Sequence, residues 1–365
     1  MGCCNSINEQ TNIRASNKRR ISKYSDQTTV SESDYIIKEE YINHNDINKK
    51  YTLSKSLGEG ATGIVCEGID KNGKHYAIKR VDKKKIKNKS LLYNEAKISL
   101  SLNHPHIIKT YEIYEDLKNV SFVMELINGG DLFEFITKSP NGKLDDSTAL
   151  NLLIQLLETL YYLHEEKHIV HRDIKPENLL VEISEDGIPN LKLIDFGFAC
   201  EITENLNGII GTPMYTAPEI ILREKYNEKV DIWSTGILFF NLLTGCEPFN
   251  SEYYIPLDEQ IINKSIPFEH ISNEKFKDLM KKLLDKNPQT RLSAKEALNI
   301  AYDLRDEMEK NELYEQFQLL DKDNLGKLPL QSLFKYFKLD IDDKNDKIVD
   351  FNEFYRIVFN SVKEY

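Results

Sequence analysis

The spacing of hydrophobic residues divides this chain into a strand-rich part followed by a helix-rich part. Between residues 51 and 127, short apolar runs such as Tyr51-Thr-Leu and His75-Tyr-Ala-Ile-Lys alternate with Gly and Asn-Gly turns, a pattern typical of antiparallel strands. One helix is expected within this part, from about Ser90 to Leu102. From Asp131 onward helical spacing dominates. We therefore predict an α+β fold of two lobes, a small sheet followed by a helical body, with a cleft between them.

Two helices of the second part have clear signals. One begins after Asp145-Asp146, and its apolar face is formed by Leu150, Leu153, Ile154, Leu157, Leu160 and Tyr161. The other covers the most apolar stretch, from Trp233 to Leu243, which is about eleven residues long and interrupted by Ser, Thr, Gly and Asn. We expect a buried helix there, and no segment of the sequence is apolar over the length that a bilayer requires.

The composition excludes several classes of protein. The chain has 365 residues, of which 40% are hydrophobic and 29% charged, so it is neither collagen-like, wholly disordered nor a small disulfide scaffold. A net charge of −11 argues against nucleic-acid binding. The five cysteines show no C-x-x-C or His-flanked spacing, so a zinc site is not expected and a reducing compartment is favoured.

A glycine-rich turn, Gly58-Glu-Gly60-Ala-Thr-Gly63-Ile-Val65, connects two predicted strands. Glycines allow backbone amides to approach phosphate oxygens without a β-carbon in the way. Dinucleotide-binding folds share this spacing, but in them the turn opens a helix, whereas here Ile64-Val65-Cys66 continues as a strand. The turn therefore indicates a site for nucleotide phosphates of another kind.

Further motifs follow in order: Ala77-Ile-Lys79, His171-Arg-Asp173-Ile-Lys175-Pro-Glu-Asn178, Asp195-Phe-Gly197 and Ala217-Pro-Glu219. With the glycine-rich turn, this set resembles the protein kinases over residues 51–301, and the whole chain resembles the calcium-dependent kinases of plants and protists. The resemblance implies a bilobal protein-kinase fold, with an N-lobe over 51–127 and a C-lobe over 128–301. It also implies transfer of the ATP γ-phosphate with Mg²⁺ as cofactor.

The resemblance assigns a role to each catalytic position. Lys79 is expected to contact the α- and β-phosphates of ATP, and Glu95 on the following helix to orient Lys79. Asp173 is expected to orient the attacking hydroxyl and to accept its proton. Lys175, two residues further on, is expected to stabilise the phosphoryl group during transfer.

The nucleotide pocket is implied in the same way. Oxygen atoms of Asn178 and Asp195 are the expected Mg²⁺ ligands. Met124 corresponds to the gatekeeper, and backbone groups of Glu125 and Ile127 are expected to bond the adenine edge. The full set of positions expected to bind ATP is Leu57, Gly58, Gly60, Gly63, Val65, Ala77, Lys79, Met124, Glu125, Ile127 and Leu180.

The acceptor is expected to be a serine or threonine hydroxyl of a protein. Lys175 together with Gly211-Thr212 resembles the serine/threonine kinases, in which Thr212 would hydrogen-bond Asp173 and Lys175. Asp131 and Glu177 can attract basic residues upstream of the acceptor. We therefore expect protein substrates with basic residues near the phosphorylated position.

Other matches concern structure and regulation. Ser99 departs from the family, which usually has a bulky apolar residue one turn after the helix glutamate, so we expect a looser stack through Phe196 and His171. Glu219 and Arg291 resemble the buried ion pair that braces the substrate-binding part of the family's fold. Asp231 resembles the helix residue that anchors the catalytic loop from beneath.

Arg172 beside the catalytic aspartate is expected to need an anion from the loop between Asp195 and Glu219. Glu201 or Glu204 would supply it permanently, and Thr203 would supply it when phosphorylated. We favour the carboxylates, because they are already present in the sequence.

Residues 1–50 are rich in Asn, Ser and charge, and they predict a flexible tail. Met1-Gly2-Cys3-Cys4-Asn-Ser fits acylation: myristate on Gly2 and palmitate on Cys3 and Cys4. A basic patch follows, formed by Arg14, Lys18, Arg19, Arg20 and Lys23. We expect lipid chains and the patch together to hold the protein on the cytoplasmic face of a membrane, with a cytosolic pool.

Residues 302–365 predict a small helical tail that resembles a shortened EF-hand pair. The first loop (321–332) has Leu325 and Ser332 at ligand positions. The second (342–353) keeps Asp342, Asp346, Asp350 and Glu353, but has lysines at a ligand position and at the turn glycine. These losses argue against Ca²⁺ binding of useful affinity. The alternative is a helical pack with a core of Leu313, Phe317, Leu320, Leu333, Phe334, Phe337, Phe354 and Ile357.

Two rival functions stay open at this point. A pseudokinase scaffold would bind nucleotide or a partner without catalysis, although Lys79, Asp173, Asn178 and Asp195 are all present. A calcium-gated enzyme would need the tail to bind calcium. Nothing indicates a particular oligomer, so a monomer is the default expectation.

Overall fold

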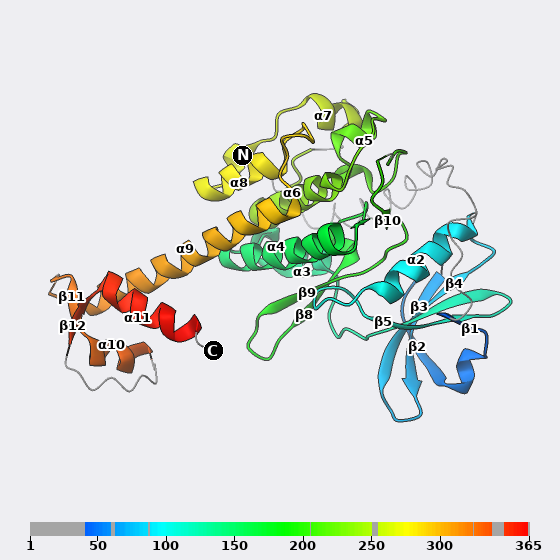
Figure 1. Cartoon of the computed structure of the whole chain (residues 1–365), viewed down its shortest axis with the longest axis horizontal. Helices are drawn as coiled ribbons and strands as arrows, with labels where there is room; N and C mark the ends of the chain where they lie inside the picture. The colour runs from blue at the N-terminus through cyan, green and yellow to red at the C-terminus, as the bar shows by residue number, and fades with distance from the viewer. Residues whose placement is uncertain are drawn as a thin grey trace. The chain divides into compact units, whose positions relative to one another are not determined.

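The strand-like runs of the first part form one six-stranded sheet in the order β1-β5-β6-β4-β3-β2 (Figure 1). The computed structural model describes residues 41–363 except 60–62, 87, 205, 250–254, 324 and 338–346. The strands of this sheet are β1 (Ile42–Asn43), β2 (Tyr51–Glu59), β3 (Gly63–Asp70), β4 (His75–Asp82), β5 (Thr110–Glu115) and β6 (Asn119–Met124). Their antiparallel hairpins confirm the strands predicted from residue 51 onward.

The beginning of the sheet lies earlier in the chain than expected. Strand β1 pairs in parallel with β5, with Ile42 opposite Ile113. The following 3₁₀ turn η4 (Ile47–Lys49) buries Ile47, which is 4% exposed and packs beside Tyr51. Asp46 caps this turn by accepting a hydrogen bond from the Asn48 N–H. Ile42 and Asn43 therefore belong to the sheet and Ile47 to its core, in contrast to the flexible tail predicted for residues 1–50.

Helix α2 (Lys89–Ser101) is the helix predicted within the first part. Asn88 begins it as an N-cap that accepts from the Ser90 N–H at 3.0 Å. Leu92 and Ala96 on one face of α2 pack against Phe122 and its neighbours in the sheet. This packing fixes the helix beside β5 and presents Glu95 toward β4.

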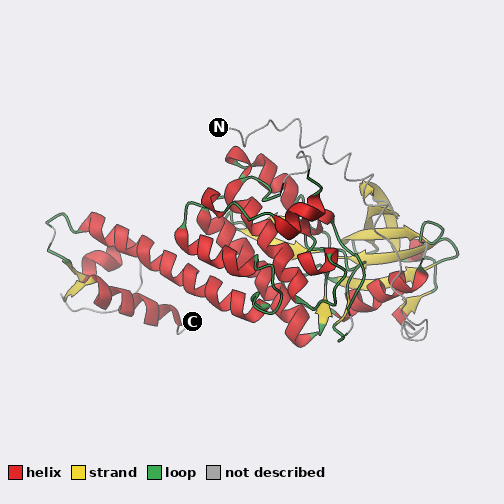
Figure 2. Ribbon diagram, turned by 90° about the horizontal axis from the view of Figure 1, so that it is seen from above, coloured by secondary structure: helices red, strands yellow, loops and turns green. Residues whose placement is uncertain are grey.

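The second part is the helical body (Figure 2), although a few short strands lie within it. Its α-helices are α3 (Leu132–Lys138), α4 (Asp146–Tyr161), α5 (Pro218–Ile221), α6 (Lys229–Thr244), α7 (Leu257–Asn263), α8 (Glu274–Leu283) and α9 (Ala294–Leu320). Its short helices are η5 (Pro140–Gly142), η6 (Tyr162–Glu166), η7 (Pro176–Asn178), η8 (Pro213–Tyr215) and η9 (Phe268–His270). Its strands pair as β7 (Ile169–Val170) with β10 (Cys200–Glu201), and β8 (Leu179–Ile183) with β9 (Pro189–Leu193).

The two predicted helices of the body are confirmed. The apolar face of α4 is buried from Leu150 to Leu160, and Asp145 caps its start through the Thr148 N–H at 2.9 Å. Helix α6 contains the apolar stretch and is buried on most sides, with Trp233 fully covered. Among the described residues, no helix is both long and apolar enough to cross a bilayer.

The predicted ion pair of the body is also present. Both guanidinium ends of Arg291 reach the Glu219 carboxylate, at 2.7 and 2.9 Å, and both side chains are nearly inaccessible to solvent. Arg291 also donates to backbone carbonyls of Asp285 and Lys229. The pair thereby joins the start of α5 to the loop before α9.

The chain divides into two compact units, one ending at Ile300 and the other running from Ala301 to Tyr365. The second contains α10 (Leu330–Phe337) and α11 (Phe351–Lys363), and its strands β11 (Lys327–Pro329) and β12 (Ile348–Asp350) pair antiparallel. Its buried core consists of Phe317, Leu330, Leu333, Val349 and Phe354, with Leu313, Leu320, Phe337 and Ile357 partly buried around it. This matches the predicted core, apart from Phe334, whose side chain lies outside the described set. The short strands were not predicted.

Arg291→Met tests the buried ion pair. Removing the guanidinium leaves the Glu219 carboxylate buried without its counter-charge, so we expect the free energy of unfolding to fall by about 3 kcal/mol or more. Equilibrium unfolding in denaturant measures this free energy, provided that its dependence on denaturant concentration (the m value) is the same in both proteins. Lys281→Met, at an exposed position of α8, is the matched control and should change little. Equal stability of the two variants would contradict the structural role assigned to the pair.

Candidate functional site

Lys79 on β4 connects the sheet, helix α2 and the loop after β9. Its ammonium nitrogen lies 2.6 Å from Glu95 Oε1 and 3.2 Å from Asp195 Oδ1. Burial favours the neutral amine, but the two carboxylates together raise the pKa of Lys79 above its ordinary value. The Lys79 charge in turn lowers the pKa of Asp195 to about 2. The pairing of Lys79 with Glu95 is the one the sequence predicts.

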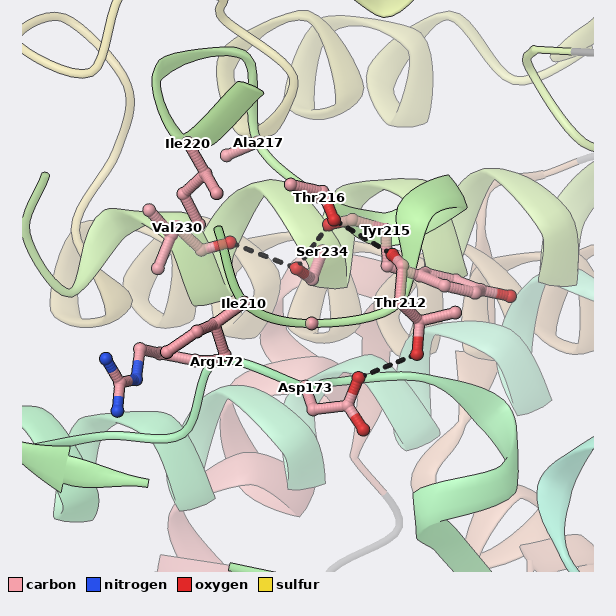
Figure 3. Close-up of a pocket in the computed structure, with 11 residues that line it drawn as sticks. Arg172, Asp173, Ile210, Thr212, Tyr215, Thr216, Ala217, Ile220, Val230 and Ser234 are labelled. Atoms are coloured by element: carbon pink, nitrogen blue, oxygen red, sulfur yellow. Dashed lines mark hydrogen bonds between the residues drawn. The ribbon is translucent and has the colours of Figure 1, made fainter. Parts of the chain in front are cut away.

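A second cluster surrounds the Asp173 carboxylate. Thr212 donates its hydroxyl to Asp173 Oδ1 at 2.7 Å (Figure 3). The Lys175 ammonium donates to Asp173 Oδ2 at 2.6 Å and to the Thr212 hydroxyl at 2.8 Å. Asn178 donates its amide to Oδ2 at 2.9 Å and to the Asp173 carbonyl at 2.8 Å. The predicted contacts of Thr212 are therefore present. The network orients a carboxylate that is only 5% exposed.

The backbone beneath Asp173 is held by Asp231 of α6. The Asp231 carboxylate accepts from the backbone N–H groups of His171 and Arg172, both at 2.8 Å, as the sequence predicts. It also lies 2.9 Å from His164 Nε2. Arg172 has φ +68° and Asp195 has φ +65°, a left-handed conformation that is unfavourable for residues other than glycine. The bonds from Asp231 hold the backbone at Arg172 in that conformation.

Three of the positions expected to contact adenine, Val65, Ala77 and Met124, share one face of the sheet. Register places Ala77 opposite Met124 and Val65 opposite Lys79, and alternate residues of a strand share a face. These side chains are partly exposed, and Leu57 is 41% exposed, as an accessible binding face requires. Leu180, from β8 of the helical body, is also partly exposed.

Backbone groups complete this face. The Glu125 N–H donates to the Lys109 carbonyl at 2.9 Å, so its own carbonyl is the group that can meet adenine. The Glu125 side chain accepts from the Lys109 N–H at 2.7 Å and pairs with the Lys192 ammonium at 3.0 Å.

The glycine-rich turn is described in part. A β-carbon at Gly58 would meet nothing within 4 Å, whereas one at Gly63 would lie 1.9 Å from the Arg80 carbonyl. Gly63 is therefore required by the close approach of β3 to β4, and Gly58 leaves its surroundings open. Gly60 lies outside the described residues.

The residues expected to hold Mg²⁺ fit that ion. Asp195 supplies carboxylate oxygens, and Asn178, whose amide nitrogen is bonded to Asp173, can present its amide oxygen. Among the described residues no three His, Cys, Asp or Glu side chains gather into a metal cluster.

Arg172 does not bind Glu201, one of the two carboxylates, Glu201 and Glu204, that the sequence predicts as its partner. Its Nε donates to the Phe198 carbonyl at 2.7 Å and its Nη1 to the Tyr226 hydroxyl at 3.2 Å. Glu201 pairs instead with Lys97 of α2 at 3.0 Å. The Glu201–Arg172 contact is therefore wrong, because β10 directs Glu201 toward α2.

Several contacts of the site have no motif that would reveal them. Asn94 donates to the Ala199 carbonyl at 2.9 Å, and Tyr226 joins Arg172 to the Asn207 carbonyl. The Asp131 carboxylate, expected near the substrate, also caps α3 through the Glu134 N–H at 2.8 Å. Only a three-dimensional structure brings these pairs together, since most are separated by tens of residues.

A small pocket lies beside the Asp173 cluster (Figure 3). It is lined by Gly211 and Thr212 from one side and by Tyr215, Val230 and Ser234 from the other. Ser234 donates to the Tyr215 carbonyl at 2.7 Å, which ties the acceptor-side loop to α6. The loop that carries Thr212 is thus fixed at both ends.

Comparison with known proteins agrees with this geometry. The protein kinase domain matches residues 51–302. The chain belongs to the protein kinase family. This kinase is 40% identical over 240 residues to "calcium-dependent protein kinase 5" of Plasmodium berghei, a match that covers 65% of this chain and 41% of the relative.

Other relatives give a similar picture. "Calcium-dependent protein kinase 5" of Plasmodium falciparum is 35% identical over 294 residues, covering 77% of this kinase and 49% of the relative. "Serine/threonine-protein kinase DCLK2" of Mus musculus is 38% identical over 273 residues, which cover 73% of this kinase and 36% of the relative. The kinase therefore spans half or less of the length of these curated relatives.

Proposed function

We propose that this protein is a serine/threonine protein kinase that transfers the γ-phosphate of ATP to hydroxyl groups of proteins, within a catalytic domain of residues 51–301. The observation that carries the proposal is the Asp173 carboxylate, oriented by Thr212, Lys175 and Asn178, in a chain that also pairs Lys79 with Asp195. The names of the relatives support the acceptor type. A pseudokinase would not need this complete arrangement.

Lys79, Glu95 and Asp195 would hold the nucleotide. Glu95 keeps the Lys79 ammonium fixed, and that charge can then bind the α- and β-phosphates without reorganisation. Asp195 and Asn178 would hold Mg²⁺, which neutralises phosphate charge when bound. The low pKa of Asp195 keeps its carboxylate ionised throughout the physiological range.

Asp173, Lys175 and Thr212 would handle the acceptor. Asp173 orients the hydroxyl and takes its proton as the oxygen forms a bond to the γ-phosphorus and the bond from phosphorus to the ADP oxygen breaks. Lys175, 2.6 Å from Asp173, places an ammonium group where negative charge is transferred. Thr212 fixes the carboxylate from the acceptor side.

Basic substrate residues would be recognised by carboxylates near this site. Glu177 is exposed one residue before Asn178. Partly desolvated surroundings and the Glu177 charge raise the pKa of Glu247 to about 7. A cationic side chain between these carboxylates would relieve their repulsion, which supports the preference for basic substrates.

Asp173→Asn tests the proposed reaction. The variant keeps the shape of the side chain but cannot accept the hydroxyl proton, so we expect phosphate transfer to a basic peptide to fall by at least about 10²-fold. Binding of Mg²⁺-ATP, measured by calorimetry, should stay close to wild type. Radiolabel transfer is the readout for both proteins. A wild type that binds nucleotide but labels no hydroxyl would leave the pseudokinase as the better description.

We also propose that residues 1–50 contain a lipid anchor, on the sequence pattern of Gly2, Cys3 and Cys4 with the basic patch after them. These positions lie outside the described residues. One myristoyl chain binds membranes with an association constant of only about 10⁴ M⁻¹, so the palmitates and the patch would provide the second signal.

Gly2→Ala tests the anchor. When the full chain is expressed with a myristoyltransferase, the wild type should sediment with vesicles that contain phosphatidylserine, and the variant should stay in the supernatant. Cys3→Ser with Cys4→Ser keeps the myristate and should give intermediate binding in cells. Equal sedimentation of wild type and Gly2→Ala would contradict acylation as the cause of membrane binding.

We infer further that residues 302–365 are a degenerate EF-hand-like unit that folds without calcium. Paired strands β11 and β12 join two helical segments, and loop carboxylates are engaged by the protein itself. Asp321 accepts from the N–H groups of Leu325 and Gly326, and Glu353 forms an ion pair with Lys347. Asp342 and Asp346 lie outside the described residues. A lysine ammonium thus neutralises a carboxylate that calcium would otherwise need.

Calcium titration of the full-length kinase tests this. We expect no heat of binding at micromolar Ca²⁺ and transfer rates that agree within about 1.5-fold between calcium and chelator, because ligand positions are lost. Lys347→Gly removes the internal ammonium and restores the turn glycine, so any calcium affinity should be higher in this variant. Micromolar affinity in the wild type would show that the unit is a calcium sensor.

A further inference from the structure

Helix α2 touches the segment after Asp195-Phe-Gly197 at two points besides Glu95. Asn94, the residue before Glu95, donates its amide to the Ala199 carbonyl at 2.9 Å. Lys97 places its ammonium 3.0 Å from Glu201 Oε1. The two contacts lie on either side of Glu95 along the helix. They fasten the helix to the activation segment, residues 195–219, without any phosphate.

The Asn94 contact is the stronger of the two. Asn94 is 7% exposed and Ala199 is 2% exposed, so the carbonyl would have no access to solvent if the amide were removed. A buried carbonyl without a donor loses the whole of its solvation. Lys97 and Glu201 are about half exposed or more, and an ion pair of that kind contributes little by itself.

The Ala199 carbonyl belongs to a segment that the catalytic loop holds in place. Cys200 and Glu201 pair with β7, and the Ile202 N–H donates to the His168 carbonyl at 2.8 Å. On the other side of Ala199, the Phe198 carbonyl accepts from Arg172. Asn94 therefore connects the helix of Glu95 to a segment that pairs with β7 and binds the Arg172 side chain.

This chain has a particular need for such a connection. Ser99 is buried on α2, one turn after Glu95, where the family usually has a bulky apolar side chain. A serine buries less apolar surface, so the helix gains less from packing at that position. A directed hydrogen bond from Asn94 supplies a restraint that the apolar contact would otherwise provide.

We propose that Asn94 is a positioning residue for phosphoryl transfer, which it supports by holding Glu95, and through it Lys79, against the activation segment. The Lys97–Glu201 pair assists it. Neither residue contacts the reacting atoms. The inference rests on the proposed kinase activity and concerns how its geometry is maintained.

Asn94→Ala is the main test. We expect kcat for a basic peptide to fall about 10-fold, the factor that corresponds to about 1.4 kcal/mol. The KM for the peptide should change little, because Asp173 and Thr212 are untouched. Amide hydrogen exchange in peptides covering 89–101 should become faster, while α6 keeps its protection. Ser101→Ala, which removes a different polar group from the same helix, should leave kcat and exchange as in wild type.

Charge reversal provides a second test should Asn94→Ala fail to fold, since Lys97 and Glu201 are exposed. Lys97→Glu and Glu201→Lys should each lower kcat about threefold, and the double reversal should restore it, as expected for a surface pair. Amide hydrogen exchange in α2 should be faster in each single variant and return to the wild-type rate in the double variant.

The outcomes separate the inference from the proposed function. A wild type without transfer would overturn the kinase activity, and hydrogen exchange would still report whether Asn94 holds α2. Wild-type kcat and exchange in Asn94→Ala would overturn the positioning role. If that variant does not fold, Asn94→Asp keeps the shape of the side chain but cannot donate to the Ala199 carbonyl when ionised, and wild-type kcat in Asn94→Asp would overturn the positioning role. A double reversal no better than the single variants would overturn the assisting role of the Lys97–Glu201 pair.

Discussion

The structure of the site depends on one buried cation between two carboxylates. Lys79, on strand β4, meets Glu95 of helix α2 at 2.6 Å and Asp195 of the loop after β9 at 3.2 Å, so three segments of the chain converge on one charge. A charge removed from water is tolerated only when its counter-charges are close and well directed. The arrangement therefore fixes the distance from the sheet to α2 and to the loop after β9. It also provides a cation for phosphate groups at that point.

The helical body solves a similar problem with a buried anion. Asp231 is inaccessible to solvent, and it is stabilised by two backbone N–H groups and His164. Those bonds hold the backbone of residues 171–173 in a conformation that includes φ +68° at Arg172. Asp231 already fixes the strained backbone beneath Asp173. Three side-chain donors are then enough to orient the Asp173 carboxylate. The rigidity of the site thus comes from α6 rather than from the loop itself.

The sequence predicted the parts of this architecture that short motifs encode. Lys79 with Glu95, Thr212 with Asp173 and Lys175, and Glu219 with Arg291 are all found as expected, because the family spacing fixes their places. The parallel strand β1 was missed, since two residues cannot show a period. The partner of Glu201 was wrong because the direction of β10 depends on its pairing with β7. The Asn94–Ala199 contact joins residues 105 positions apart, a separation over which no local pattern carries information.

The contacts of Arg172 change how a phosphate on the activation segment would act. In the expected arrangement an anion would neutralise an arginine that lacked a partner. Here the guanidinium already donates to the Phe198 carbonyl and the Tyr226 hydroxyl. A phosphate on Thr203 would gain charge-assisted bonds, which are about twice as strong as neutral ones. Because a guanidinium has five N–H donors, such a phosphate could bind Arg172 while these two bonds remain. Its effect is the difference between two bonded states, and the carbonyls of residues 198 and 199 already bind the segment to Arg172 and Asn94 in the unmodified chain.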